Sequence, residues 1–398
     1  MTQSSAGRGG AGLAVAVCFL IAALEGYDIQ AFGVAAPSLV PELGLNAGQQ
    51  GWAASAAMFG LVIGAFAGSW MADKVGRKPV LIASVIAFGA CSIWTGLTHG
   101  YEALLIARFA TGLGFGGALP NLIAIATEVS DPRRRAVTMS AMFCGMPAGG
   151  ASVALLARLA GDGLDWRTIF IIGGVLPLAL VPIVVLLLPE TRPAHDPAAD
   201  GRVLKALFGG GRATPTILLW AANLLTLLVM YLLLNWLPTL VVAKGHSAGD
   251  GASASLAFNL VGVAGALLLG LLVDRVGFRW SLMVAYVALA AAMAGLGAAG
   301  GLGGILFFSA AAGFLVLGAQ YALYGLPSWL YPAQVCAAGA GAAVGVGRLG
   351  SIVGPLLAGE LRHAGWSAGQ VLTAMLPIAM AAGAAVFVLT WLARVDGD

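Results

Sequence analysis

Long apolar runs alternate with short polar breaks along the whole chain. Each run is about 20 residues long, the length at which an α-helix crosses the hydrocarbon core of a bilayer. The runs lack the alternating pattern of short strands that a membrane barrel shows. The pattern predicts an all-α membrane protein with twelve transmembrane helices, near residues 12–37, 50–72, 79–98, 102–126, 136–159, 168–188, 215–240, 253–273, 281–299, 303–326, 338–361 and 369–393.

A polar break divides the predicted spans into two groups of six. Residues 189–214 form the longest polar stretch of the chain, and their Pro, Asp and Arg content indicates a linker. The sequence GSWMADKVGRK at Gly68–Lys78 returns as GLLVDRVGFR at Gly270–Arg279, in matching places of the two groups. We therefore expect an N-terminal six-helix bundle over residues 1–188, a cytoplasmic linker and a C-terminal six-helix bundle over 215–398, related as parallel repeats.

Composition and charge agree with a protein that lies in a bilayer. Only 9% of the residues are charged, against about 25% in soluble domains. The 58 glycines are typical of membrane helices that pack through small residues. Basic residues are scattered through loops on one side, so we expect no nucleic-acid partner, and the positive-inside rule predicts cytoplasmic termini. The basic residues on that side are Arg8, Lys74, Arg77, Lys78, Arg133, Arg134, Arg135, Arg192, Arg202, Lys205, Arg212, Arg275, Arg279 and Arg394.

Two carboxylates interrupt the first apolar run, in the sequence LEGYDIQAFG. Inserting an Asp at the bilayer centre costs roughly 2.5 to 3.5 kcal/mol, so such a residue usually faces a polar cavity and has a function. Glu25 and Asp28 are three residues apart, which on a helix places both side chains on one face. The spacing indicates a pair that can share or exchange a proton.

The chain offers no motif for catalysis, metal binding or nucleotide binding. The four cysteines have no paired spacing, and no Ser/His/Asp set or phosphate-binding loop before a Lys and Ser/Thr occurs. We therefore expect no enzyme, no cofactor and no metal site. Without a site for ATP, the energy for any transport must come from an ion gradient, and the acidic pair makes the proton the expected coupling ion.

Six short motifs are spread over almost the whole chain. They are GYDIQAFG in the first predicted span, DKVGRK after the second, RFATGLGFGGALPN in the fourth, CGMPAGG in the fifth, LPE after the sixth and VGRLGSIVGPLLAG in the eleventh. In this order they resemble the motifs of the major facilitator superfamily, and within it those of the aromatic acid/proton symporters. The resemblance implies a major facilitator fold in which spans one, four, seven and ten line a central cavity.

The resemblance makes Arg108 a partner for the acidic pair. Arg108 lies in span four at a depth similar to that of Asp28 in span one. A guanidinium holds a neighbouring carboxylate ionised, whereas desolvation drives the carboxylate to take up a proton, so the balance between the two sets when the proton binds. We expect Glu25, Asp28 and Arg108 to couple transport to protons. A static ion pair is the alternative, and Glu25 alternatively faces a neighbouring helix.

Arg348 is the clearest signal in the second half. No other charged residue lies between Arg279 and Arg348, which falls near the middle of span eleven. A guanidinium at this depth needs an anion, which is the carboxylate of a substrate or of the other half, unless backbone carbonyls bind it. Trp236 and Trp329 are expected in an interfacial aromatic belt. The other expected substrate-binding residues are Gln30, Asn121, Tyr231, Asn235, Gln320, Tyr321 and Tyr324.

The repeated loops are expected to form gates. A carboxylate near the N-terminus of a helix in the opposite half gains from the positive end of the helix dipole. The resemblance assigns this gating motif to Asp73, Gly76, Arg77, Asp274 and Arg275. The alternative for either aspartate is a solvated loop charge.

Together these observations predict a secondary active transporter. We expect proton-coupled uptake of a small aromatic carboxylate, such as a hydroxyphenylpropionate or a benzoate-type acid, by alternating access. The alternatives are a proton-driven antiporter that exports small organic molecules, because antiporters share the fifth-span motif, and a membrane sensor in the same fold. The expected location is a bacterial cytoplasmic (inner) membrane, and the expected state is a monomer.

Overall fold

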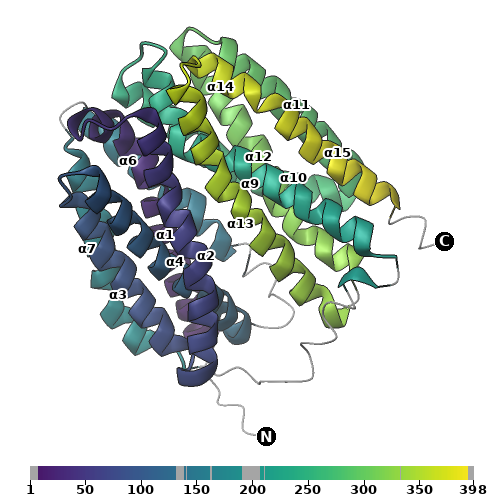
Figure 1. Ribbon diagram of the computed structural model, residues 1–398. Coiled ribbons are helices and arrows are strands. Elements are labelled where there is room, and N and C mark those ends of the chain that lie inside the picture. Colours follow the sequence, from purple (N-terminus) through teal and green to yellow (C-terminus); the bar gives the residue numbers. More distant parts are fainter. Residues whose placement is uncertain are drawn as a thin grey trace, which may run out of the picture. The chain divides into compact units, whose positions relative to one another are not determined.

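The computed structural model describes residues 8–130, 139, 141–161, 164–190, 207–209, 211–331 and 333–392. Within these residues the secondary structure is helical and contains no strand, and twelve helices are long and apolar enough to cross a membrane (Figure 1). The prediction of an all-α membrane protein with twelve spans is confirmed. Arg133, Arg134, Arg135 and Arg394, and most of the predicted linker, lie outside the described residues.

The helices follow the predicted spans, and the longest of them extend a few residues beyond the apolar runs at one or both ends. The first six spans correspond to α1 (Arg8–Glu42), α2 (Ala47–Val75), α3 (Arg77–Gly96), α4 (Tyr101–Val129), α6 (Gly145–Ala160) and α7 (Trp166–Leu187). The second six correspond to α9 (Ala213–Val242), α10 (Ala248–Val276), α11 (Phe278–Ala298), α12 (Leu302–Leu330), α13 (Ala333–His363), and α14 (Ala368–Ala374) together with α15 (Leu376–Leu392).

The last span is broken where the sequence predicts a single helix over 369–393. Helix α14 ends at Ala374, and α15 begins at Leu376. Pro377 follows directly. Its ring removes a backbone donor and clashes with the preceding turn, which interrupts a helix. The apolar period continues through the break, so the run length alone does not reveal it.

The chain divides into two compact units. The first comprises residues 1–45 and 56–195, and the second comprises 46–55 and 196–398. The boundary between His195 and Asp196 therefore falls within the range 189–214. Each unit contains the same set of helix pairs: α1 with α6, and α3 with α7 in the first, and α9 with α13, and α11 with α15 in the second.

The paired helices cross at glycines in equivalent places of the two units. In the first unit, a Cβ on Gly149 of α6 would lie 1.8 Å from the carbonyl oxygen of Ala23 on α1. In the second unit, a Cβ on Gly350 of α13 would lie 1.9 Å from the carbonyl oxygen of Leu224 on α9. Only a residue without a side chain allows these backbones to approach so closely.

The remaining long crossings show the same correspondence. Helices α2 and α4 meet where a Cβ on Gly112 would lie 1.9 Å from the carbonyl oxygen of Ala57. Helices α10 and α12 meet where a Cβ on Gly313 would lie 2.0 Å from the carbonyl oxygen of Phe258. The helix packing of one unit is thus repeated in the other.

The repeated loop motif has one backbone conformation in both units. Gly76, between α2 and α3, has φ 99° and ψ 162°, and Gly277, between α10 and α11, has φ 87° and ψ 163°. Two residues later, a basic side chain binds the end of the sixth span of its own unit. Lys78 Nζ donates to the carbonyl of Val185 at 2.7 Å, and Arg279 Nη2 donates to the carbonyl of Thr390 at 2.7 Å.

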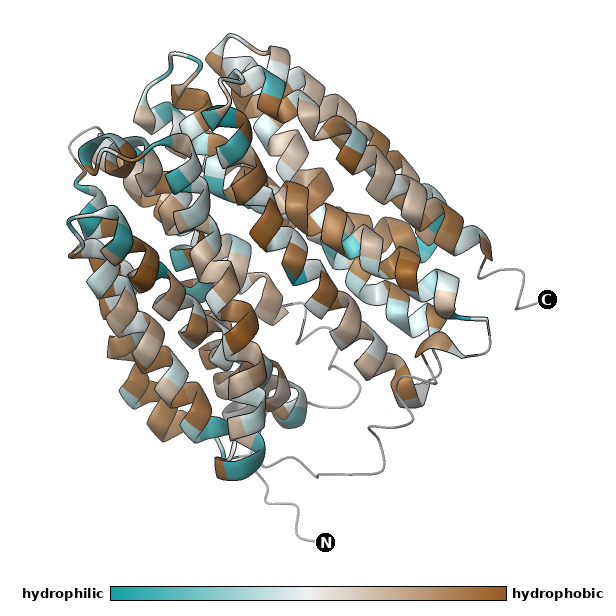
Figure 2. Cartoon of the chain, in the orientation of Figure 1, coloured by the Kyte–Doolittle hydropathy of each residue, from teal (hydrophilic) through white to brown (hydrophobic). Residues whose placement is uncertain are grey.

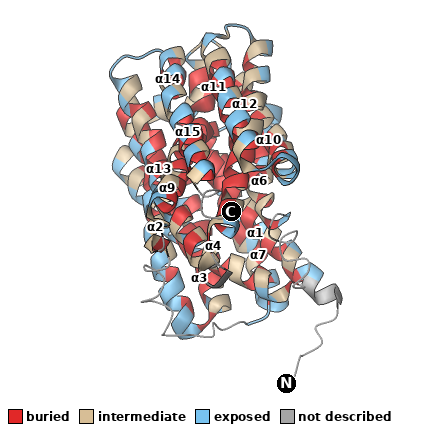
Figure 3. Ribbon diagram, turned by 90° about the vertical axis from the view of Figure 1, so that its right-hand side faces the viewer, coloured by how far each residue is buried: buried red, intermediate tan, exposed pale blue. Residues whose placement is uncertain are grey.

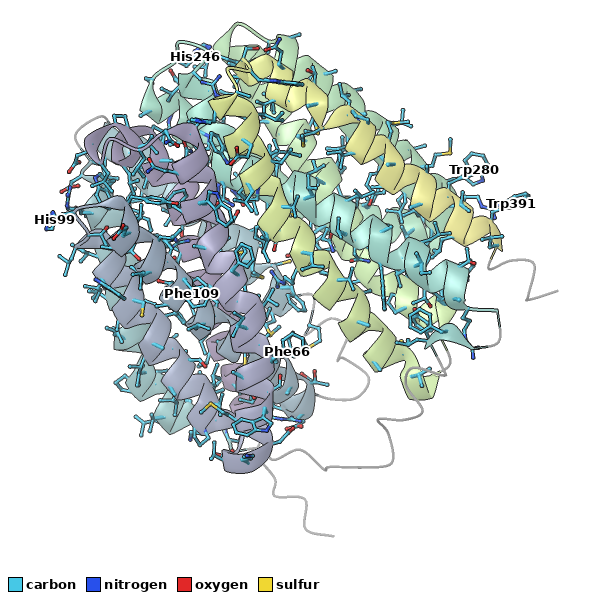
Figure 4. All side chains as sticks on the ribbon, in the orientation of Figure 1. Phe66, His99, Phe109, His246, Trp280 and Trp391 are labelled. Carbon is cyan, nitrogen blue, oxygen red and sulfur yellow. The ribbon has the colours of Figure 1, made fainter. Side chains whose placement is uncertain are left out.

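The outer surfaces of the helices are apolar, as a lipid environment requires. Figure 2 shows hydrophobic residues along the helix lengths and hydrophilic residues mainly at their ends. Buried residues follow the sides of the helices that face their neighbours (Figure 3). At the ends of α11 and α15, the side chains of Trp280 and Trp391 project outward (Figure 4) and are 55% and 60% exposed, which is typical of interfacial aromatic residues.

Candidate functional site

A buried ion pair lies in the first unit, between α1 and α4. Arg108 Nη1 donates to Asp28 Oδ1 at 2.6 Å, and the two side chains are 1% and 0% exposed. The rings of Phe32 and Phe170 lie 5.7 and 5.6 Å from the guanidinium carbon. Because the aromatic faces carry partial negative charge, they add a favourable interaction with the cation while keeping water away.

The ion pair leaves hydrogen-bonding capacity unused on both partners. Among the described residues, Asp28 Oδ2 accepts no hydrogen bond and Arg108 Nε donates none. Glu25 lies about one turn earlier on α1 and is 0% exposed. The first unit therefore buries two carboxylates, one turn apart on α1, and one guanidinium on α4.

Helix packing holds this region rigidly. Gly26, between the two carboxylates in sequence, lies against α6, where its Cβ would be 2.0 Å from the carbonyl oxygen of Met146. Tyr27 donates from its hydroxyl to the carbonyl of Ile169 on α7 at 3.1 Å. The two residues between the carboxylates thus pack α1 against α6 and α7, while Asp28 binds Arg108 on α4.

Gln30 and Asn121 are buried in the same unit, 1% and 3% exposed. The side-chain nitrogen of Asn121 donates to the carbonyl of Gly117 on its own helix at 2.8 Å. No hydrogen bond joins Asn121 to the ion pair. Its expected role in substrate binding stays a prediction.

A second polar cluster lies in the second unit and has a different composition. Arg348 on α13, 9% exposed, donates from Nη1 to the hydroxyl oxygen of Tyr231 on α9 at 2.8 Å. Tyr324 on α12 interacts electrostatically with both of them. Three of the predicted substrate-binding residues, from three helices, are thus brought together around one cation.

Amide side chains continue this cluster along α9 and α12. Gln320 Nε2 donates to Asn223 Oδ1 at 3.1 Å, and Asn223 Nδ2 donates to the carbonyl of Leu219 at 2.9 Å. Sequence reasoning missed Asn223. The signal that could have found it is its spacing of eight residues, about two helical turns, from Tyr231 on the same apolar span.

The structure places the remaining candidates of this unit less directly. Asn235 Nδ2 donates to the carbonyl of Tyr231 on its own helix at 2.9 Å. The ring of Tyr321 meets that of Tyr324 edge-on, with centroids 5.9 Å apart. Trp236 is 1% exposed and donates from Nε1 to the carbonyl of Pro355 at 3.0 Å, so its expected place in an aromatic belt is wrong. It connects α9 to α13 instead, because a buried indole N–H needs an acceptor.

Trp329 and the predicted gating residues lie near the helix ends. Trp329 is 44% exposed, as a belt residue would be. Asp73 and Asp274 are exposed near the ends of α2 and α10, and Arg275 is exposed beside Asp274.

The loops differ at the residue after the glycine. Arg77 forms an ion pair with Glu128 at the end of α4, whereas Phe278 occupies the equivalent position in the second unit. A Cβ on Gly76 would lie 2.4 Å from Glu190 Oε1, so the carboxylate of Glu190 approaches the N-terminus of α3. A negative charge is favourable there because of the helix dipole.

Charged groups buried in a bilayer are costly, and a helical bundle that only anchors a domain has no use for them. Twelve spans with such groups in both units are typical of a membrane transporter rather than an enzyme. The chain belongs to the Major Facilitator Superfamily, whose family model matches residues 18–355.

Characterised transporters resemble the chain over nearly its full length. It is 41% identical over 377 residues to the 3-(3-hydroxy-phenyl)propionate transporter of Escherichia coli (strain K12), covering 95% of this chain and 93% of that protein. It is 32% identical over 404 residues to the 4-hydroxybenzoate transporter PcaK of Pseudomonas putida, covering 92% of this chain and 90% of that protein.

Solved structures support the same fold. The crystal structure of a D-xylose-proton symporter superimposes with a TM-score of 0.76 at 17% identity, covering 96% of this chain and 97% of the other. A bacterial homologue of the human lysosomal transporter Spinster, in an inward-facing and unoccupied conformation, gives a TM-score of 0.74 at 19% identity and covers 97% and 96%. The major facilitator fold expected from the sequence is confirmed.

Proposed function

We propose that the protein is a secondary active transporter that couples the uptake of a small aromatic carboxylate to protons by alternating access. The names of its relatives support the substrate class. These relatives are named as transporters of 3-(3-hydroxy-phenyl)propionate, 4-hydroxybenzoate and gallate. The symport of protons by a transporter of similar fold is consistent with the coupling ion.

The buried pair of Asp28 and Arg108 carries the coupling proposal. One oxygen of Asp28 binds the guanidinium, and the other accepts no hydrogen bond from the described residues, so it is free to take a proton. Protonation of a carboxylate weakens its attraction to Arg108. Opening the region to water stabilises the ionised form and releases the proton. Glu25, on the same face of α1, provides a second place for the proton.

Arg348 is the proposed anchor for the carboxylate of the substrate. It carries a positive charge within α13, donates to the hydroxyl of Tyr231 and interacts with the phenol of Tyr324. A guanidinium binds a carboxylate through two parallel hydrogen bonds, which gives both affinity and orientation. The aromatic residues of the cluster, Tyr231, Tyr321 and Tyr324, suit a ligand that carries a ring.

The stoichiometry determines which gradient drives uptake. One proton that moves with one carboxylate anion transfers no net charge, so such a cycle responds to the pH difference alone. Each pH unit contributes about 1.36 kcal/mol per proton. A second proton, for which Glu25 offers a place, would add about 2.3 kcal/mol per 100 mV of membrane potential.

We further propose that the protein works as a monomer in a bacterial inner membrane, with both termini and the linker on the cytoplasmic side. The loop residues Asp73 and Asp274 would then lie at the cytoplasmic surface. In this proposal the loop motifs act as gates, and the ion pair of Arg77 with Glu128 strengthens the gate of the first unit.

Reconstituted vesicles test this function. The purified chain in liposomes should accumulate labelled 3-(3-hydroxyphenyl)propionate or 4-hydroxybenzoate when the outside is acidic, up to about tenfold for each pH unit. For a cycle of one proton per substrate, a potassium diffusion potential should not change this accumulation.

Two results would contradict the proposal. Flux that does not depend on pH on either side would exclude proton coupling. Loss of internal substrate while protons enter the vesicle would show an exporter, which is the function that the fifth-span motif also permits.

A further inference from the structure

The amide pair of Asn223 and Gln320 has only one arrangement that satisfies its hydrogen bonds. Asn223 Nδ2 donates to the carbonyl of Leu219, so its oxygen must face away from its own helix backbone. That oxygen accepts from Gln320 Nε2 at 3.1 Å. Rotating the amide of Gln320 by half a turn would bring two acceptor oxygens together, which is repulsive. Asn223 therefore orients the Gln320 amide so that Nε2 faces Asn223 and Oε1 points away from it.

The outward end of this amide is an acceptor that has no donor. Gln320 is 2% exposed, and its Oε1 receives no hydrogen bond from any described residue. A buried acceptor that lacks a donor destabilises the structure, because it has lost its hydrogen bond to water. No side chain in the described part of the chain donates to Gln320 Oε1. A ligand that brings a hydrogen-bond donor to this oxygen would therefore bind more tightly.

This acceptor belongs to the cluster around Arg348. Gln320 lies four residues before Tyr324 on α12, a separation of about 6 Å along the helix. Tyr324 interacts with Arg348. Gln320 and the tyrosine that interacts with Arg348 therefore lie about one helical turn apart on α12, so the unmet acceptor belongs to the cluster around this cation.

We propose that Gln320 accepts a hydrogen bond from a hydroxyl group on the ring of the substrate, and that Asn223 positions Gln320 for this contact. The site then selects hydroxylated aromatic acids over the same acids without the hydroxyl or with a methyl ether in its place. The inference rests on the proposed function, because it assumes that Arg348 binds the carboxylate of the same ligand.

The chemistry distinguishes three ligands of nearly equal size. A phenolic hydroxyl donates to Gln320 Oε1. A ring that carries hydrogen at this position leaves Oε1 without a donor, and a methyl ether places a second acceptor oxygen against it. Sites that hydrogen-bond a substrate hydroxyl reject analogues that lack it far more strongly than apolar pockets reject a missing methylene. We expect the wild-type protein to bind the hydroxylated acid about 10- to 100-fold more tightly than either analogue.

Binding to the purified full-length protein tests the contact. The probes are 3-phenylpropionate, its 3- and 4-hydroxy derivatives and the corresponding methoxy compounds, and the hydroxy isomer that binds more tightly is compared with its own analogues. Gln320→Met keeps the length of the side chain but removes both amide groups. It should reduce the hydroxyl preference to about twofold or less, by weakening the hydroxylated acid while the unsubstituted acid binds as before.

The positioning role of Asn223 has a test of its own. Asn223→Leu frees the Gln320 amide to rotate and present its N–H₂ group, so the methoxy analogue should gain affinity while the hydroxylated acid loses it. Asn223→Asp keeps an acceptor beside Gln320 Nε2 and should restore the hydroxyl preference. Asn259→Leu is the matched control, because Asn259 Nδ2 also donates to its own helix, to Ser255 at 2.8 Å, but on α10.

The outcomes separate this inference from the proposed function. If the wild-type protein binds aromatic carboxylates and Gln320→Met keeps the full hydroxyl preference, the role of Gln320 is excluded. If Asn223→Leu and Asn259→Leu change the preference equally, the positioning role is excluded. If the wild-type protein binds none of these acids, the proposed function fails, and the inference fails with it.

Discussion

The two units share one arrangement of helices, which we call the frame, and differ in the charged residues that are buried within it. Their helix pairs, crossing glycines and loop conformations correspond closely. In the first unit the buried charges are two carboxylates and one guanidinium, and an ion pair joins Asp28 to Arg108. Among the described residues of the second unit the buried charge is Arg348, which donates to the phenol of Tyr231 and interacts with that of Tyr324. A repeated fold thus allows one copy to bury an ion pair and the other to bury a guanidinium beside phenols.

The difference follows from what each environment needs. A buried ion pair is already neutralised, so it gains little from a further anion, but it changes greatly when one carboxylate takes a proton. A guanidinium that donates to a neutral phenol, as Arg348 does to Tyr231, gains charge-assisted hydrogen bonds when it binds an anion. The comparison predicts that variants of the first unit alter proton coupling and variants of the second alter ligand affinity.

The largest expected effect is that of Asp28→Asn. This change removes the anion of the ion pair and the group proposed to carry the proton, so pH-driven accumulation should be lost, while exchange of labelled for unlabelled substrate persists. Breaking a buried pair by removing one partner costs about 3 to 5 kcal/mol of stability. Accumulation and exchange in liposomes, with thermal unfolding in detergent, measure both effects.

A double variant separates coupling from stability. Asp28→Asn with Arg108→Gln removes both partners of the ion pair, so no guanidinium is left buried without its carboxylate, and it should recover most of the thermal stability without recovering accumulation. Normal accumulation by Asp28→Asn would remove the first unit from the coupling mechanism.

Arg348→Lys should have the next largest effect. It keeps the positive charge but loses the planar group that binds a carboxylate through two hydrogen bonds. We expect the Kd for an aromatic carboxylate to rise about ten- to a hundredfold, with little change for the corresponding amide. The dependence of the residual uptake on external pH should stay as in the wild type. Equal losses for the acid and the amide would give Arg348 a structural role.

The sequence predicts the frame better than it predicts the sites. The length and period of the apolar runs are enough for twelve spans, because the bilayer imposes one length on every helix. The break at Pro377 is missed because the apolar run continues through it. Glu25, Asp28, Arg108 and Arg348 are recognisable because a charge within an apolar run is unusual.

Uncharged polar residues are harder to interpret from the sequence. Asn223 and Asn121 look alike in the sequence, since both are uncharged amides in apolar spans. Both donate to a carbonyl four residues earlier on their own helix, but only Asn223 also accepts from an amide on another helix. Such a contact depends on which helix faces lie together, and this is a property of the packing rather than of the local sequence.

The shared frame itself can be tested by filling its crossings. Gly265→Ala places a methyl group 2.0 Å from the carbonyl oxygen of Phe314, and Gly112→Ala places one 1.9 Å from that of Ala57. Such overpacking costs about 1 to 3 kcal/mol. Both variants should therefore unfold at lower temperature, by similar amounts, when tryptophan fluorescence is followed in detergent.

A second glycine of α10 provides the control for this experiment. No heavy atom lies within 4 Å of a Cβ built on Gly270. Gly270→Ala should be neutral or raise the stability by up to about 1 kcal/mol, since Ala favours the helix. A loss of stability in Gly270→Ala as large as in Gly265→Ala would show that helix contacts do not explain these glycines.

The smallest effects should come from the basic residues that bind the last spans. Lys78→Met and Arg279→Met each remove one hydrogen bond from a cation to the carbonyl end of a helix, an interaction worth about 0.3 to 1 kcal/mol. The Arg279 guanidinium also lies 5.8 Å from the ring of Phe387, so its loss should be the larger by about 0.5 kcal/mol. Thermal unfolding at low and high salt measures both, with Arg275→Met as the control for losing an exposed charge. If only one of these two variants were destabilised, the repeated loop motif would have a structural role in one unit alone. The two units would then correspond in their helix crossings but not in the function of their loops.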